Sequence, residues 1–195
     1  GYPDGTFRPS QSIKRAEFAT ILHRLGLKST DSSAVGQVAD YKDVTAKHWA
    51  SEAIAAMQLA GLMRGDNQGR FRPEAAVTRA EMASIVARLL PSGTTGQART
   101  DVPEDLRGHW AAGAITQALQ AGILQGYPDG TFRPDRTLTR AEAVRVLNQL
   151  LARPTPDVSK SSWPDVPAKH WAIRDIESAS GTVMMSSDGS VQIFK

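Results

Sequence analysis

The sequence has no cysteine among its 195 residues, which excludes disulfides, thiol nucleophiles and cysteine-ligated metal sites. It has no apolar run near the roughly 18 residues that a membrane-spanning helix needs. No basic segment followed by an apolar one begins the chain, so we expect no signal peptide within it. Charge is nearly balanced, with 23 Lys and Arg against 20 Asp and Glu, a net charge of +3. This excess is too small to predict nucleic-acid binding, but its sign favours an anionic partner.

Two blocks of sequence recur along the chain. The first block is Gly-Tyr-Pro-Asp-Gly-Thr-Phe-Arg-Pro, found at 1–9 and 126–134, with a looser copy at 65–73. An Arg-Ala-Glu triplet follows each copy, at 15–17, 79–81 and 140–142. The second block leads from Asp-Val to His-Trp-Ala, at 43–50, 101–111 and 165–172. Such repetition predicts small units that cover one another's apolar faces.

These blocks divide a single predicted domain, 1–195, into repeats. Two whole repeats occupy 41–90 and 100–151, with a trailing half repeat at 1–26 and a leading half repeat at 163–181. We expect the two halves to pair and complete a third lobe. The alternative is that missing residues of a longer parent chain complete the first unit. In the tail, 182–195, two short apolar runs flank an Asp-Gly turn and predict a β-hairpin.

Each repeat is predicted to contain two helices. After the Arg-Ala-Glu triplet, apolar residues follow the i, i+3, i+4, i+7 spacing of one helix face, as in Met82, Ile85, Val86 and Leu89. Thr78 and Thr139 open capping boxes with the Glu three residues later, whereas Lys14 replaces this Thr in the first copy. The earlier helix is predicted to start near the Trp of the second block. It ends at Gly61 or Gly122, where glycine can adopt a positive φ.

The run over 101–142, from Asp-Val through His-Trp-Ala to Leu-Thr-Arg-Ala-Glu, resembles a surface-layer homology (SLH) repeat. The resemblance implies an all-α domain of three two-helix repeats, related by a pseudo-threefold axis around a central helical core. It also implies a secreted, non-catalytic module of the cell wall or S-layer that binds a cell-wall polysaccharide. In many members the ligand is a secondary cell-wall polymer whose terminal sugar carries a pyruvate ketal. No cofactor or metal is implied, and neither is nucleic-acid binding or membrane insertion.

The triplet arginines Arg15, Arg79 and Arg140 are the first candidates for ligand binding. Each is placed at the first turn of a helix, where backbone amides and the helix dipole favour an anion. A guanidinium also matches a carboxylate with two parallel hydrogen bonds. In the family that the sequence resembles, this Arg contacts the ligand. The alternative is an Arg that pairs with a neighbouring carboxylate. The adjoining Thr78, Thr139 and Lys14 complete the predicted binding set, while the triplet Glu is better explained by capping.

Aromatic and histidine side chains give weaker signals. Trp49, Trp110 and Trp171 could stack on a sugar, but their spacing to an Ile five residues later favours a place in the core. The preceding histidines could form a threefold metal site, although loop or cap roles are favoured. The Asp-Gly stretches lack the ligand series of a calcium loop and are interpreted as turns. Phe7, Phe71 and Phe132 are expected to be buried, and the arginines after them are secondary candidates for glycan contact.

Three functions compete at this point. The leading hypothesis is an anchor that holds an anionic polysaccharide in grooves between repeats. The second is a lattice or protein–protein assembly module, with possible self-assembly in an S-layer. The third is part of a hydrolase, but the sequence offers no nucleophile–base pair, and one Glu per repeat does not supply the paired carboxylates of a glycosidase. We therefore predict a binding module and no enzyme.

Overall fold

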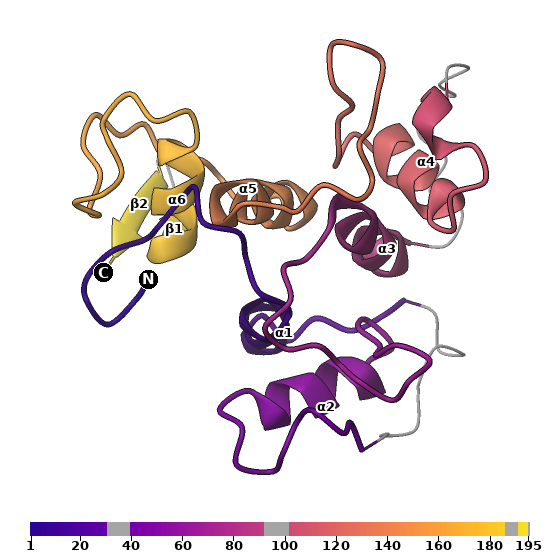
Figure 1. Cartoon of the computed structure of the whole chain (residues 1–195). Helices are drawn as coiled ribbons and strands as arrows, with labels where there is room; N and C mark the ends of the chain where they lie inside the picture. Colours follow the sequence, from indigo (N-terminus) through magenta and orange to yellow (C-terminus); the bar gives the residue numbers. More distant parts are fainter. Residues whose placement is uncertain (31–39, 92–101, 186–190, 195) are drawn as a thin grey trace. The chain divides into compact units, whose positions relative to one another are not determined.

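The computed structural model describes residues 1–30, 40–91, 102–185 and 191–194 (Figure 1). The described helices, in chain order, are α1 (Arg15–Arg24), α2 (Ser51–Leu59), α3 (Arg79–Leu89), the short 3-10 helix η2 (Glu104–Leu106), α4 (Ala112–Gln120), α5 (Arg140–Leu150) and α6 (Ile173–Ser180). They pack in consecutive pairs, α1 with α2, α3 with α4 and α5 with α6. The helical repeats confirm the predicted all-α class.

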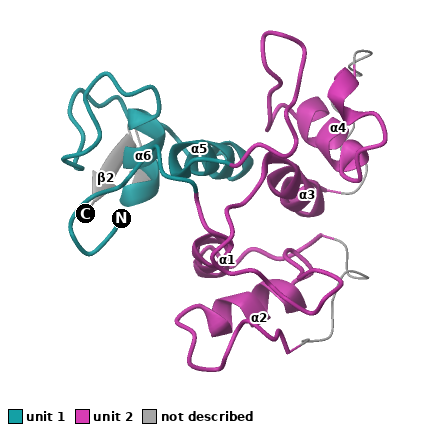
Figure 2. Cartoon of the chain, viewed as in Figure 1, with its two compact units in different colours: residues 1–12, 138–195 teal, residues 13–137 magenta. Residues whose placement is uncertain are grey.

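The chain forms two compact units (Figure 2). One contains residues 1–12 and 138–195, and the other contains residues 13–137. The expected pairing of 1–26 with 163–181 in a third lobe stays a prediction. Residues 1–12 belong with 163–181, but α1 packs against α2 in the other unit. The division follows from chemistry, because the apolar face of α1 is covered by the helix that comes next in sequence.

The helix that begins at each Arg-Ala-Glu triplet starts as the sequence predicts. Thr78 and Thr139 accept hydrogen bonds from the N–H groups of Glu81 and Glu142, and each Glu side chain accepts from its own Thr N–H. At α1, Lys14 keeps half of this arrangement, since its N–H donates to the Glu17 carboxylate at 2.9 Å. A lysine ammonium has no lone pair, so it cannot accept the second bond.

A histidine side chain shapes the turn that leads into the second helix of each pair. In His48, His109 and His170, Nδ1 accepts a hydrogen bond from the N–H of the Ala two residues later, at 3.1–3.2 Å. Gly61 and Gly122 end α2 and α4 with φ of 70° and 71°, as predicted. These histidines therefore shape the turn into the helix, which agrees with the loop or cap role that the sequence favoured.

A buried Phe from each copy of the first block anchors its loop. Phe7, Phe71 and Phe132 are at most 4% exposed. Their N–H groups donate to the carboxylates of Asp165, Asp43 and Asp105, respectively. Two of these acids belong to the Asp-Val pairs. In the third copy Asp105 takes this role, whereas Asp101 lies outside the described residues.

The core of the first unit joins the two ends of the chain. Phe7 packs with Ala141 and Val144 of α5 and with Val166, Ile173 and Ile176 around α6. After α6, strands β1 (Thr182–Met185) and β2 (Val191–Phe194) pair antiparallel, with Thr182 opposite Phe194 and Met185 opposite Val191. The predicted hairpin strands are thus confirmed, while the Asp-Gly turn lies outside the described residues.

Candidate functional site: the helix-start arginines and their aromatic neighbours

Arg15 is buried, with 4% of its surface exposed, at the start of α1. Its Nε donates to the Phe71 carbonyl at 2.8 Å, and its Nη2 donates to the Arg64 carbonyl at 2.7 Å. Its Nη1 donates to Glu81 Oε1 at 2.6 Å and forms an ion pair. Burial lowers the pKa of Arg15, and the negative charge of Glu81 opposes that shift. The guanidinium thus joins α1 to the loop and helix of the next repeat.

Arg79 and Arg140 repeat this geometry. Arg79 Nε donates to the Phe132 carbonyl at 2.8 Å and its Nη2 to the Gln125 carbonyl at 2.7 Å. Arg140 Nε donates to the Phe7 carbonyl at 2.9 Å. Each side chain is at most 9% exposed. All three arginines therefore hold a Phe loop in place, and direct ligand contact by them stays a prediction.

The sequence suggested that the N–H groups at these helix starts are free to bind an anion. In the structure, the first two of them are already hydrogen-bonded within the protein. The Arg and Ala N–H groups of each triplet donate to carbonyls of a first-block loop. The acceptors are Ala75 and Pro73 for α1, Arg136 and Pro134 for α3, and Gln11 and Pro9 for α5. The neighbouring copy of the repeat already satisfies these amides. The helix dipole therefore stabilises contacts between repeats.

Two of these buried arginines, together with exposed arginines of the first-block loops, gather around tyrosine rings. Near Tyr127, the guanidinium carbons of Arg133, Arg79 and Arg136 lie 4.1, 5.0 and 5.9 Å from the ring centre. In the other unit, those of Arg8 and Arg140 lie 4.0 and 4.7 Å from the centre of Tyr2. We call these the Tyr127 cluster and the Tyr2 cluster. Each combines positive charge with an aromatic face.

One exposed arginine of each cluster is held by a local acid. Arg133 Nη2 donates to Asp129 at 2.6 Å, and Arg8 does the same to Asp4. Hydrogen bonds from Thr131 and Arg133 lower the pKa of Asp129 to about 2. Arg8, Arg72 and Arg133 all have φ between 56° and 59°, a left-handed conformation that is uncommon for residues other than glycine. This backbone geometry recurs in every copy of the loop.

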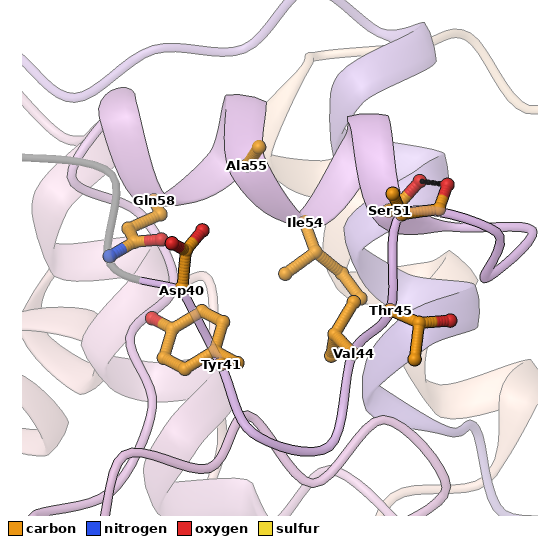
Figure 3. Close-up of a pocket in the computed structure, with 9 residues that line it drawn as sticks. Asp40, Tyr41, Val44, Thr45, Ser51, Ile54, Ala55 and Gln58 are labelled. Atoms are coloured by element: carbon orange, nitrogen blue, oxygen red, sulfur yellow. Dashed lines mark hydrogen bonds between the residues drawn. The ribbon is translucent and has the colours of Figure 1, made fainter.

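A cavity of about 600 Å³ adjoins the Tyr127 cluster. It is lined by Tyr127, by its loop neighbours Gln125, Gly126, Pro128 and Gly130, and by Val102, Pro103, Glu104 and Leu119. A smaller cavity of about 190 Å³ lies beside α2, where Tyr41 and Gln58 approach Asp40 (Figure 3). Among the described residues, one acidic side chain lines each cavity, Asp40 in the smaller and Glu104 in the larger. The cavity beside Tyr127 suits an acidic ligand better because three guanidiniums lie around that tyrosine.

The three tryptophans of the second block lie at the surface, so their interpretation as core residues is wrong. Trp49, Trp110 and Trp171 are 62%, 68% and 55% exposed. The Ile five residues later is buried in each repeat instead. Each Trp precedes the first helical turn and therefore lies outside the apolar face of the helix. Its ring packs on the preceding His ring, at 5.5–5.7 Å between centres.

The described residues contain no group of three or more His, Asp or Glu side chains arranged to hold a metal ion. Within the same residues, no helix combines the length and apolarity that crossing a membrane requires.

The sequence model of the S-layer homology domain matches residues 1–19, 40–83 and 104–144. Cell surface glycoprotein 1 of Acetivibrio thermocellus is 37% identical over 90% of this chain, which spans 8% of that protein. The cellulosome-anchoring protein of the same organism is 36% identical over 90% of the chain, which spans 40% of it. The S-layer protein of Bacillus licheniformis is 34% identical over 75% of the chain and 16% of its own length. The chain thus spans less than half the length of each of these relatives.

Proposed function

Because the chain belongs to the S-layer homology domain family, we propose that it is a non-catalytic module that attaches a larger protein to the bacterial cell surface. Three relatives with surface, anchoring and S-layer names support this assignment. The part of each relative that matches is this repeat region. We assign no reaction to it.

The ligand that we propose is an anionic cell-wall polysaccharide, recognised by the Tyr127 and Tyr2 clusters. The observation that carries this proposal is the gathering of Arg79, Arg133 and Arg136 around one half-buried tyrosine beside a cavity of about 600 Å³. Like charges brought together around an aromatic ring favour an anion of matching shape. An aromatic ring also offers a flat surface to the apolar face of a sugar.

Within that class we propose a sugar carboxylate, such as a pyruvate ketal. A guanidinium and a carboxylate are both planar and can form two parallel hydrogen bonds. The buried arginine of each triplet holds the cluster in place through the Phe carbonyl, while the exposed arginine is accessible to the ligand. In this scheme Arg15, Arg79 and Arg140 contribute positive charge and position the loop.

Sedimentation with isolated cell walls tests the proposal. The protein should co-sediment with walls and should lose this binding when the wall polymer is removed by mild acid. The double variant Arg133→Gln, Arg136→Gln should bind at least about tenfold more weakly, because charge-assisted hydrogen bonds are lost. Arg174→Gln is the matched control, since this exposed arginine pairs with exposed Asp157 and belongs to neither cluster.

The second candidate is a module for lattice assembly, favoured by the S-layer name of one relative. Binding to walls that survives removal of the polymer, together with self-association in sedimentation velocity, would favour assembly over polysaccharide binding. A titration with the wall polymer before and after chemical removal of pyruvate then tests the ligand class. Equal binding of both forms would exclude the ketal as the recognised group.

A further inference from the structure

The cavity of about 190 Å³ beside α2 shares no lining residue with the Tyr127 cluster or its cavity. Its walls come from the loop that precedes α2 and from one face of α2 itself. All of its lining residues belong to the unit formed by residues 13–137. Because a cavity of about 150 Å³ holds one benzene molecule, this one has room for a ligand of about six to eight heavy atoms.

One end of this cavity combines a carboxylate with a side-chain amide. Figure 3 shows the Asp40 carboxylate and the Gln58 amide together at that end. Gln58 is buried, with 7% of its surface exposed, whereas Asp40 is exposed to solvent. Among the described residues that line the cavity, Asp40 is the charged one. A negative charge beside an amide carbonyl favours a cation that donates hydrogen bonds.

Tyr41 forms a fixed wall next to this acidic end. Its Oη accepts the Gly65 N–H at 2.9 Å, and its ring centre lies 5.4 Å from that of Phe71. A Cβ atom on Gly65 would come within 2.3 Å of the Tyr41 ring, so ring and backbone are already in close contact. The positive charge of Arg15 lies near Tyr41, but Arg15 is paired with Glu81. The negative charge of Asp40 therefore dominates the cavity itself.

The middle of the cavity is apolar, and its other end carries hydroxyl groups. Val44 and Ile54 lie between the two ends in Figure 3, and Ile54 is 1% exposed. Thr45 and Ser51 lie at the other end, where Ser51 Oγ donates to the Ala46 carbonyl at 3.2 Å. This order of acid, aliphatic surface and hydroxyls suits an elongated ligand with a positive group at one end.

The pair of Asp40 and Gln58 is specific to this repeat. The loops of the three repeats align on the aspartates that accept a Phe N–H, namely Asp43, Asp105 and Asp165. On this alignment Val102 and Ser162 replace Asp40. Leu119, at the same distance from its Trp, replaces Gln58 in the next repeat. The fold therefore accommodates apolar residues at both positions, and the acid and the amide are not needed to build it.

We propose that this cavity binds a primary ammonium group carried on a short aliphatic stem. Asp40 supplies the counter-charge, and the Gln58 carbonyl oxygen accepts a second N–H of the ammonium, which has three donors and no acceptor. Val44 and Ile54 cover the stem. A free aliphatic amine and the lysine side chain of a peptide share this chemistry. The proposal does not depend on polysaccharide binding.

Nitrogen-15 NMR tests the site through the backbone N–H of Ala55, which lines the cavity. At pH 7, pentylammonium should shift this signal and bind about fivefold more tightly than 1-pentanol, which has the same size and no charge. Asp40→Asn should bring the amine down to the level of the alcohol. The control Asp135→Asn, which removes an exposed acid outside the cavity, should not. Equal binding of the two ligands to wild type, or an unchanged preference in Asp40→Asn, would overturn the proposal.

A second variant guards against a folding defect in Asp40→Asn. Gln58→Leu introduces the residue that the next repeat has at this position, so circular dichroism and the thermal midpoint should stay close to wild type. Its preference for the amine over the alcohol should fall, because one acceptor is lost while the apolar surface remains. An undiminished preference in this folded variant would contradict the assigned role of Gln58.

A third ligand distinguishes the two sources of the ammonium group. Nα-acetyl-lysine methylamide presents a lysine side chain within a peptide backbone. Binding as tight as that of pentylammonium would assign the site to a peptide, and weaker binding would assign it to a free amine. In both cases Asp40→Asn should abolish the advantage of the positive charge, and failure to do so would overturn the site.

Discussion

Arg15 and Glu81, 66 positions apart in sequence, form a buried ion pair with 2.6 Å between Nη1 and Oε1. Glu81 uses its other oxygen, Oε2, to accept the Thr78 N–H at 2.9 Å. One carboxylate therefore caps its own helix and neutralises an arginine from the preceding repeat. Through these two contacts, Glu81 connects α1 to α3.

The first prediction concerns this pair. Glu81→Gln should lower the free energy of unfolding by about 3–5 kcal/mol, because a buried guanidinium is left without its counter-charge. Urea denaturation followed by circular dichroism measures this. Glu74→Gln is the matched control: its partner Lys14 is exposed, so the loss should be about 0–1 kcal/mol. Equal losses in the two variants would show that the burial of Arg15 is unimportant.

Helix capping gives the second prediction. Thr139→Ala should destabilise the protein by about 1 kcal/mol, since the Glu142 N–H loses its acceptor at the start of α5. The reverse change, Lys14→Thr, should stabilise α1 by about 0.5–1 kcal/mol, less the small contribution of the Lys14–Glu74 pair. Thermal unfolding should therefore move in opposite directions for the two variants. A lower midpoint in Lys14→Thr would contradict the capping argument.

The third prediction tests the junction of the two chain ends. Asp165 accepts hydrogen bonds from Phe7 N–H at 2.8 Å and Arg8 N–H at 2.6 Å. Asp165→Ala should release the first twelve residues, so chymotrypsin should cleave after Phe7 several-fold faster than in wild type. Asp157→Ala serves as the control, since this exposed acid pairs only with Arg174 at the surface. Unchanged cleavage in Asp165→Ala would mean that Phe7 burial alone holds the segment.

Acid should loosen the first-block loops, which is the fourth prediction. Asp129 has its pKa lowered to about 2 from an ordinary value of 3.8, and hydrogen bonds from Thr6 and Arg8 lower the pKa of Asp4 further. A group whose pKa is lower in the folded state stabilises that state above its unfolded pKa. The contribution is therefore fully present above pH 4 and is lost as the pH falls toward 2.

The measurement compares wild type with Asp129→Asn. Stability of wild type between pH 4 and pH 2 should fall more steeply than that of the variant, which has no carboxylate to protonate at this position. Sodium chloride should change this difference little, because hydrogen bonds from Thr131 account for the largest part of the pKa shift. Parallel pH profiles for the two proteins would show that Asp129 does not contribute.

Much of the local structure could be predicted from the sequence. The capping boxes at Thr78 and Thr139 and the positive φ at Gly61 depend on residues close together in the chain. Period and turn chemistry determine such features, because the hydrogen-bond partners lie within a few positions. The hairpin strands after α6 followed from the same kind of signal.

What only the tertiary structure decided was the set of partners of each polar group. The sequence placed Arg79 at a helix start with open amides, but those amides and the guanidinium bind carbonyls of a loop more than 40 residues away. The sequence also favoured a buried Trp110, which is exposed, and gave no sign that it shares a cavity with Arg88. Repetition in sequence determined that the same motif occurs three times. Long-range packing determines which first-block loop accepts the hydrogen bonds of each helix-start arginine. No local sequence pattern contains this information.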